Sequence, residues 1–197
     1  TILLHINILF AMNQNLQNKK GLVESVFNKV YDKYDLMNDF MSMGIHRLWK
    51  KDMINWMAPF PKKKLIDMAC GTGDVGKLFL ENTNYEGKVL FVDPNSKMLE
   101  KGIKRLKNYK NISWKKGSAE KAPAPNNYFD YYCISFGLRN TKNISKSLKE
   151  AYRILKPGGR FLCLEFSKVQ NLHFDNLYKK YAKLIPHIGK IVVGEKE

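Results

Sequence analysis

The sequence predicts an α/β protein in which helices cover both faces of a mostly parallel sheet, preceded by a helical cap. Three observations predict it. Apolar side chains recur at helical spacing over 22–34 and 45–58. From residue 64 onward, short apolar runs alternate with amphipathic stretches, and strands joined through helices run parallel. The length of 197 residues is that of one domain with a real core.

The domain prediction divides the chain at residue 22. Residues 1–21 are expected to be a leader that is disordered or not native, because TILLHINILFAM is too short to span a bilayer and lacks the basic start of a signal peptide. Residues 22–197 are expected to be a single domain. Within it, 22–60 form the helical cap and 64–197 the α/β core.

Each element is predicted from its own pattern. Pro59 and Pro61 end the second cap helix, and the LKPGG stretch at 155–159 ends a helix and turns the chain into a strand. The predicted strands are 64–68, 88–92, 111–115, 129–135 and 160–166. The predicted core helices are 74–82, 96–108, 143–155 and 173–185.

The composition leaves two interpretations of the charge open. Lysine and arginine number 34 against 18 acidic residues, a net charge of +16. This predicts either an anionic partner, such as nucleic acid or an acidic membrane face, or a solvated lysine surface. Three cysteines without paired spacing favour a reducing compartment, and four scattered histidines predict no metal site.

The stretch ACGTGDVGK contains G-x-G-x-x-G, the pattern of a dinucleotide-binding turn, between Gly71 and Gly76. Asp67 at the end of the strand and Asp74 at the start of the helix would repel a diphosphate. They suit a ligand with cationic groups. S-adenosylmethionine carries an ammonium and a sulfonium, and its carboxylate can accept from the backbone of the Gly71–Gly73 turn.

Two further strand exits carry residues that suit this cofactor. Asp93, after the second strand, is expected to accept the ribose hydroxyls, and the Ser118-Ala119-Glu120 loop follows the third strand. The alternative is that all of these are ordinary turn and cap residues. Together, they predict a methyl donor rather than a nicotinamide cofactor.

The fourth strand exit, Ser135 to Asn140, reads SFGLRN. It lacks the polar-Pro-Pro-aromatic clamp that methylation of an adenine amine needs. Cys133 lies inside an apolar strand rather than in an exposed loop, so it does not suit pyrimidine C5 methylation. We therefore expect no nucleic-acid substrate.

The chain resembles the ubiquinone/menaquinone biosynthesis C-methyltransferase family. The matching stretches are VFNKVYDKYDLMND, MSMGIHRLWKK, LIDMACGTGD, FDYYCISFGLRN and LKPGGRFLCLEFSK, which together span nearly all of 22–168. The resemblance implies a Rossmann-like class I methyltransferase and transfer of a methyl group from S-adenosylmethionine to a ring carbon of a polyprenylated benzoquinol, a demethylmenaquinol, or both. By the family pattern, the cofactor contacts are Thr72, Asp93, Ser118, Ala119 and Ser135. Family members continue into further helix and an antiparallel hairpin, so the last strands are expected to be missing after IVVGEKE.

The chemistry of a ring carbon points to four candidate catalytic residues. A phenol with a pKa near 10 must lose its proton to activate the adjacent carbon. Arg139 stays protonated and is expected to stabilise the phenolate or orient a water. Asn140 is expected to hold the substrate oxygen or Arg139. Asp35 and Asp39 are candidate proton acceptors, with helix capping as the alternative.

The partners expected from this reading are a polyprenylated quinol and the surface of an anionic membrane, with a homodimer or a quinone-synthesis assembly as further options. The expected location is the cytoplasm, at the inner membrane, or the matrix side in a eukaryote. Three rival functions stay open: a methyltransferase for another small acceptor, a cofactor-binding scaffold without catalysis, and a nicotinamide dehydrogenase.

Overall fold

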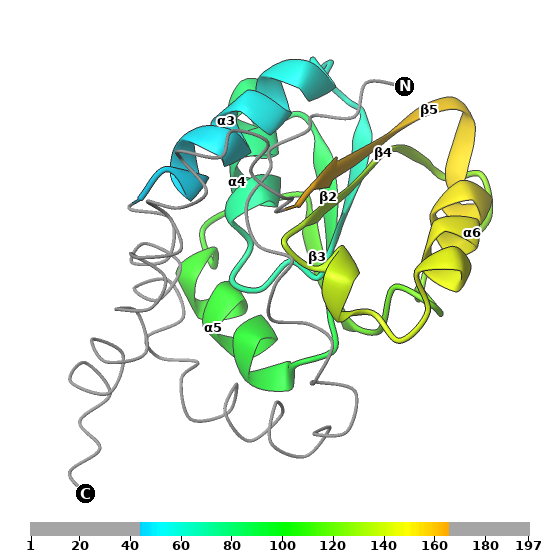
Figure 1. The fold of residues 1–197 in the computed structure, drawn as a ribbon. Coiled ribbons are helices and arrows are strands. Elements are labelled where there is room, and N and C mark those ends of the chain that lie inside the picture. Colours follow the sequence, from blue (N-terminus) through cyan, green and yellow to red (C-terminus); the bar gives the residue numbers. More distant parts are fainter. Residues whose placement is uncertain (1–43, 166–197) are drawn as a thin grey trace, which may run out of the picture. The chain divides into compact units, whose positions relative to one another are not determined.

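The computed structural model describes residues 44–165, and a five-stranded parallel sheet forms the centre of that part of the chain (Figure 1). The strand order is β3-β2-β1-β4-β5. The elements are α3 (His46–Met57), β1 (Lys64–Met68), α4 (Asp74–Asn82), β2 (Lys88–Asp93), α5 (Ser96–Arg105), β3 (Ile112–Lys116), β4 (Phe129–Ser135), the 3₁₀ turn η2 (Leu138–Asn140), α6 (Ile144–Ile154) and β5 (Leu155–Leu164). The predicted fold class is confirmed.

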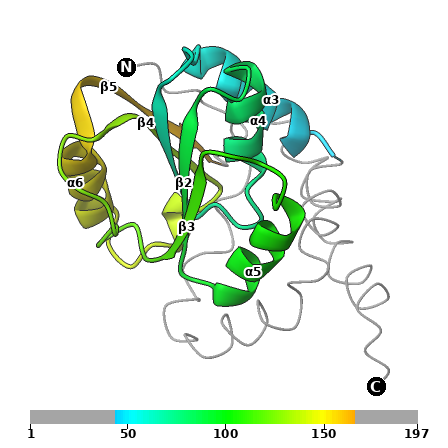
Figure 2. The same ribbon diagram turned by 180° about the vertical axis from the view of Figure 1, so that it is seen from behind.

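Helices cover both faces of this sheet, as predicted. Residues 49–165 belong to one compact unit. Within it, α4 and α5 lie on one side of the sheet and α6 on the other, which the view from behind also shows (Figures 1 and 2). The direction of the chain across the sheet reverses between β1 and β4, since β2 and β3 extend from one side of β1 and β5 from the far side of β4. Ligands of open parallel sheets bind beyond the strand ends at this point.

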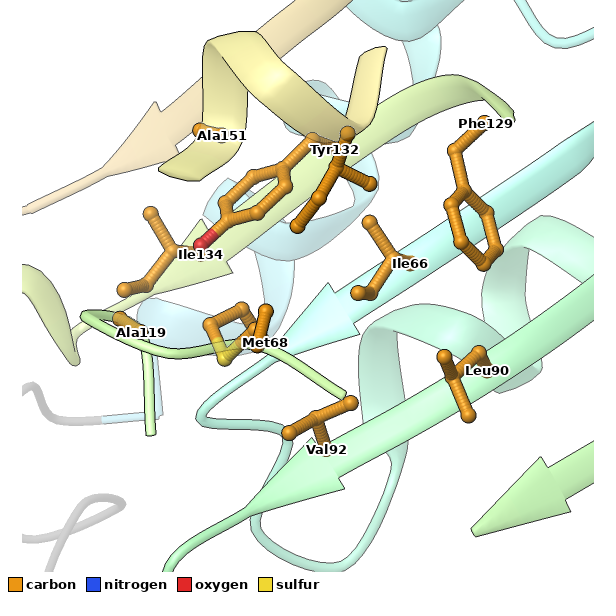
Figure 3. Packing of buried hydrophobic residues seen from close by; sticks show 11 residues of the cluster. Ile66, Met68, Leu90, Val92, Ala119, Phe129, Tyr132, Ile134 and Ala151 are labelled. Carbon is orange, nitrogen blue, oxygen red and sulfur yellow. The ribbon is translucent and has the colours of Figure 1, made fainter. Parts of the chain in front are cut away.

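Alternation along the strands separates two cores. Ile66, Met68 and Ile134 face α6 and pack with its Ala151 and Ile154 in one buried cluster (Figure 3). The side chains between them in sequence face α4 and α5, because successive residues of a strand point to opposite faces. Asp67, Asp93 and Ser135 share that second face through this alternation, each at or near the carboxyl end of its strand.

Most predicted bounds hold to within a residue, and two do not. The helix predicted over 96–108 ends at Arg105, because the chain turns over 106–108 around a buried Leu106. The strand predicted over 160–166 begins at Leu155 and ends at Leu164. Its pairing explains the first difference: Leu155 pairs with Phe129, but the next pair is Arg160 with Tyr131. Residues 156–159 therefore bulge out of the ladder around Gly158 (φ +76°), where LKPGG predicted a turn.

The helix starts follow local chemistry. The side chain of Asn95 accepts from the backbone N–H groups of Lys97 and Met98, and Asn143 caps α6 in the same way through Lys146. Helix α4 has no such cap: it begins after Gly73, whose φ of +88° a residue with a side chain would adopt only at a cost. The start of α4 therefore follows a glycine turn instead of a side-chain cap.

Helix α3 confirms the second cap helix and its stop before Pro59. Its buried apolar side chains are Met53, Ile54 and Met57. The guanidinium of Arg160 donates to the Met57 carbonyl at 3.0 Å, which ties the end of α3 to β5. The leader, the predicted helices at 22–34 and 173–185 and the missing last strands lie outside the described residues, so these stay predictions, as does the domain division.

Candidate functional site

The predicted site residues gather at the carboxyl edge of the sheet, where the loops after β1 and β4 leave side by side. Ala69 (φ +53°) and Phe136 (φ +54°) are the first residues after these two strands, and both adopt the left-handed conformation. Such residues cost about 1–3 kcal/mol each and are concentrated at functional sites. A Cβ on Gly137 would stand 2.6 Å from the Ala69 Cβ, so the two loops are packed directly against each other.

The Gly71–Gly73 turn is closed by two hydrogen bonds. The Gly73 N–H donates to the Cys70 carbonyl at 2.9 Å, and the Gly71 N–H donates to the Asp93 carboxylate at 2.9 Å. A Cβ on Gly71 (φ +55°) would meet nothing within 4 Å. No residue of 44–165 therefore covers this face of the turn. That open face is where a ligand has room.

The third glycine of the motif has a packing role. A Cβ on Gly76 would lie 2.2 Å from the Phe91 ring, which itself stacks on Trp114 with ring centroids 4.1 Å apart. Helix α4 therefore needs glycine here to approach the sheet. The G-x-G-x-x-G pattern thus describes a turn and a close helix–strand contact, and neither is specific to a dinucleotide.

Asp67 and Asp93 are buried carboxyls below and beside the turn. Asp67 accepts from the Gly76 N–H at 2.9 Å and from the Cys133 thiol at 3.4 Å, and burial raises its pKa to about 7. Asp93 accepts from Gly71 and, at 2.8 Å, from the Asn95 N–H, and burial raises its pKa. Each oxygen has a further lone pair. The predicted cofactor contacts of both residues stay predictions.

Asp74 differs from the sequence-based expectation. Its carboxylate oxygens contact Lys50 Nζ at 2.8 Å and Arg105 Nη1 at 2.5 Å. Burial by itself would raise its pKa, but these two cations lower the pKa to about 2. Its charge is therefore already balanced, and of the two carboxyls in the electrostatic argument against a diphosphate only Asp67 remains.

The loops after β1 and β3 place three more predicted cofactor residues. Thr72 is buried, and its hydroxyl accepts from Arg105 at 2.9 Å. Ser118 begins a short turn, in which its own carbonyl accepts from the Lys121 N–H. The Ala119 methyl belongs to the core cluster on the α6 face (Figure 3), so only its backbone is left for a ligand. The neighbouring Glu120 accepts from the Lys142 N–H at 2.5 Å, which joins this loop to the one before α6.

Ser135, at the end of β4, carries a buried hydroxyl oxygen that has no hydrogen-bond partner among residues 44–165. A buried polar atom without a partner is uncommon and calls for an explanation. A ligand bound at this strand end would supply the partner. Ser135 thus fits its predicted role.

Arg139 and Asn140 form the 3₁₀ turn that follows. The Arg139 guanidinium pairs with the carboxylate of Glu165, the first residue after β5, and the same carboxylate accepts from the Arg139 N–H at 3.2 Å. The Asn140 amide donates to the Phe136 carbonyl at 3.5 Å. Both residues are exposed. Asp35 and Asp39, the other two candidate catalytic residues, lie outside the described residues.

Sequence reasoning missed Lys50, Arg105 and Glu165. A weak signal existed only for Glu165, because it lies near the end of the predicted strand 160–166, the next strand along the chain after the one that ends in SFGLRN. Lys50 and Arg105 contact Asp74 from helices 24 and 31 positions away in sequence, and no spacing reveals such a contact. Among the described residues, no three histidine, cysteine or acidic side chains gather as metal ligands would.

The model of the ubiE/COQ5 methyltransferase family matches residues 13–197. The chain belongs to this family. A family member from Rickettsia akari, named ubiquinone/menaquinone biosynthesis C-methyltransferase UbiE, is 46% identical over 186 residues, covering 91% of this chain and 75% of that protein. The protein of the same name from Brucella abortus is 44% identical over 193 residues, covering 94% and 70%.

Solved structures share the fold of this ubiE/COQ5 family member. An S-adenosylmethionine-dependent methyltransferase from Methanococcus maripaludis, described as putative, aligns with a TM-score of 0.63 at 18% identity, covering 82% of this chain and 72% of that chain. The YcgJ protein of Bacillus subtilis aligns with a TM-score of 0.54 at 24% identity, covering 57% and 48%. At such identities the likeness confirms the Rossmann-like fold.

Proposed function

We propose that this chain methylates a ring carbon of a polyprenylated benzoquinol, a demethylmenaquinol, or both, in ubiquinone or menaquinone synthesis. The observation that carries the proposal is the identity of 44–46% over more than nine tenths of the chain with proteins named for that reaction. S-adenosylmethionine is the proposed cofactor and supplies the methyl group when bound. The nicotinamide alternative lacks support, because the turn matches a methyltransferase family.

The residues at the strand ends fit this cofactor. The buried Ser135 hydroxyl lacks a partner among residues 44–165, and the face of the turn at Gly71 is open. Asp93 retains lone pairs for two hydroxyl groups. We therefore assign cofactor binding to Asp67, Thr72, Asp93, Ser118, Ala119, Ser135 and the Gly71–Gly73 turn.

Arg139 is the proposed catalytic group on the acceptor side. A guanidinium stays protonated at neutral pH, so it acts by stabilising the oxyanion of the quinol rather than by removing a proton. Its partner Glu165 orients it. Asn140 is proposed to hold the substrate oxygen, and Asp35 or Asp39 to accept the proton.

Methyl transfer to a short-chain demethylated quinol, followed by mass spectrometry under reducing conditions, tests this function. We expect a carbon-methylated product, and Arg139→Ala should reduce kcat by about 10²–10³-fold, as loss of an oxyanion donor does. Binding of S-adenosylhomocysteine, measured by calorimetry, should stay unchanged in this variant, because Arg139 is not assigned to the cofactor. Titration with NADH should give no binding.

The outcome separates the rivals. Cofactor binding without product from either quinol would support another acceptor or a scaffold and contradict the proposed reaction. An oxygen- or nitrogen-methylated product would contradict carbon transfer. Full activity of Arg139→Ala would remove that residue from the mechanism.

The net charge of +16 supports peripheral contact with an anionic membrane, where a polyprenylated substrate resides. Within residues 44–165, no helix combines the length and apolarity needed to cross a membrane. We propose a cytoplasmic protein that binds the membrane surface through its lysines. Sedimentation with anionic vesicles should fall steeply between 50 and 500 mM salt, by the usual screening of surface charge; sedimentation that does not respond to salt would contradict it.

A further inference from the structure

Helix α3 contacts both loops of the candidate site through two consecutive residues. Trp49 packs its ring 6.4 Å from that of Phe136, in the loop after β4. Lys50 Nζ contacts Asp74, at the end of the turn after β1, at 2.8 Å. These loops leave the sheet at the point where strand order reverses. Neither residue belongs to the motifs that define the cofactor site, so their contacts call for a separate explanation.

The Lys50–Asp74 pair is shielded from solvent. The side chain of Lys50 is 12% exposed and that of Asp74 is 26% exposed. A pair with this burial is screened by salt much less than a surface pair. The lowered pKa of Asp74 keeps the carboxylate ionised over the whole neutral range. The positive charge of Lys50 also acts on Asp67 beneath the turn.

Helix α5 approaches the same turn from the other side. Arg105 donates to the Thr72 hydroxyl at 2.9 Å and contacts the second oxygen of Asp74 at 2.5 Å. One helical turn earlier, a Cβ on Gly102 would lie 3.3 Å from the Thr72 carbonyl, so α5 packs directly on the turn. Thr72 and Asp74 flank Gly73 on either side, and both are therefore held by side chains from outside the motif.

We infer that Lys50 and Arg105 are positioning residues that hold the Gly71–Gly73 turn in the conformation in which it binds S-adenosylmethionine. They act through Asp74 and Thr72 and do not themselves contact the cofactor. The inference rests on the proposed function in one respect, that this turn binds that cofactor. It adds that α3, which also contacts the loop carrying Arg139, couples the placement of the cofactor turn to that of the acceptor side.

The test compares Lys50→Met with Lys77→Met. Methionine keeps the length of lysine and removes its charge. Lys77 is the matched control, because it lies on α4, pairs with Glu81 at 3.5 Å and has a side chain that is 36% exposed. Calorimetry with S-adenosylhomocysteine should give a Kd raised about tenfold for Lys50→Met and within twofold of the wild type for Lys77→Met. Lys50→Arg should restore most of the affinity.

Kinetics distinguish positioning from a loss of folded protein. For Lys50→Met, KM for S-adenosylmethionine should rise with Kd while kcat at saturation stays within about twofold, because the turn is displaced rather than lost. A merely structural role would lower the melting temperature and the active fraction, and leave KM unchanged. In the double variant Lys50→Met/Asp74→Asn, the Kd should equal that of Asp74→Asn alone, since Asp74→Asn already removes the ion pair with Lys50 together with the one to Arg105.

Each outcome decides between the claims. If the wild type binds the ligand and Lys50→Met and Arg105→Gln bind equally well, the inference is wrong and the proposed function stands. If the wild type does not bind it, both are wrong. If Lys50→Met fails to fold, Arg105→Gln decides, because that side chain is 38% exposed and its loss is tolerated more easily; a Kd raised at least threefold supports the inference.

Discussion

At the scale of single residues, the site consists of carboxyls with different partners. Asp93 holds the backbone of the Gly71–Gly73 turn, Asp67 lies buried under α4, and Asp74 is paired with two cations. Glu165 holds Arg139. The four acids therefore have separate tasks: Asp74 and Glu165 are paired with cations, whereas Asp67 and Asp93 accept from backbone N–H groups.

Glu165 is expected to affect turnover rather than cofactor binding. Its carboxylate orients Arg139 by contacting both the guanidinium and the backbone N–H. Glu165→Gln keeps an acceptor but removes the charge, which halves the strength of such hydrogen bonds. We expect kcat for quinol methylation to fall about tenfold, while the Kd for S-adenosylhomocysteine is unchanged.

Lys142→Gln is the control for this variant, since it removes an exposed charge near the same loop. An unchanged kcat in Glu165→Gln would show that Arg139 is oriented without it. A raised Kd for S-adenosylhomocysteine in Glu165→Gln would place Glu165 on the cofactor side of the site.

At the scale of elements, close approach of helices to the sheet explains the glycines. Gly76 allows α4 to contact Phe91, and Gly102 allows α5 to contact Trp114, against which a Cβ would stand at 2.4 Å. These contacts bring the start of α4 and the end of α5 to the same turn. The position of Arg105 in the site is a consequence of that packing.

The strand β5 illustrates how a local signal and the final pairing combine. LKPGG stops α6 as predicted, but the strand resumes pairing only at Arg160, so four residues bulge from the edge of the described sheet. Helix α3 is held at the point where this pairing resumes, since the guanidinium of Arg160 donates to the carbonyl of Met57, the last residue of α3. Elements distant in sequence thus meet through single side-chain contacts.

At the scale of the whole molecule, the pKa shifts predict an acidic stability optimum for the ligand-free chain. A carboxyl with a raised pKa in the folded state binds more protons folded than unfolded, so stability falls as pH rises from about 4 through 7; this is the case of Asp67. A carboxyl with a lowered pKa acts oppositely, and Asp74 contributes about 2 kcal/mol above pH 4 that is lost toward pH 2. The melting temperature should therefore peak near pH 4 and be lower at pH 8.

Thermal unfolding of the wild type and of Asp67→Asn between pH 3 and pH 8 checks this. The amide keeps an acceptor for the Gly76 N–H and cannot titrate, so the fall between pH 5 and pH 8 should be reduced. A melting temperature that rises over this range, or an equal fall in the variant, would contradict the assignment.

The sequence by itself determined the alternation of strands and helices, the parallel sheet and the residues at the strand exits. Period and turn chemistry are local properties, so 64–68, 88–92 and 129–135 could be predicted closely, and Asp93 and Ser135 could be placed at strand ends. The family resemblance added the reaction and the interest in Arg139.

Only the tertiary structure decided how the charges are paired. Asp74 looked like a free carboxylate for a cationic ligand, yet Lys50 and Arg105 balance it, and Arg139 pairs with Glu165. The strand order, with its reversal between β1 and β4, likewise came from the structure. The physical reason is that the interaction of two charges depends on their distance in space. The close packing of α4 at Gly76 and of α5 at Gly102 sets that distance, and the spacing of residues along the chain does not encode it.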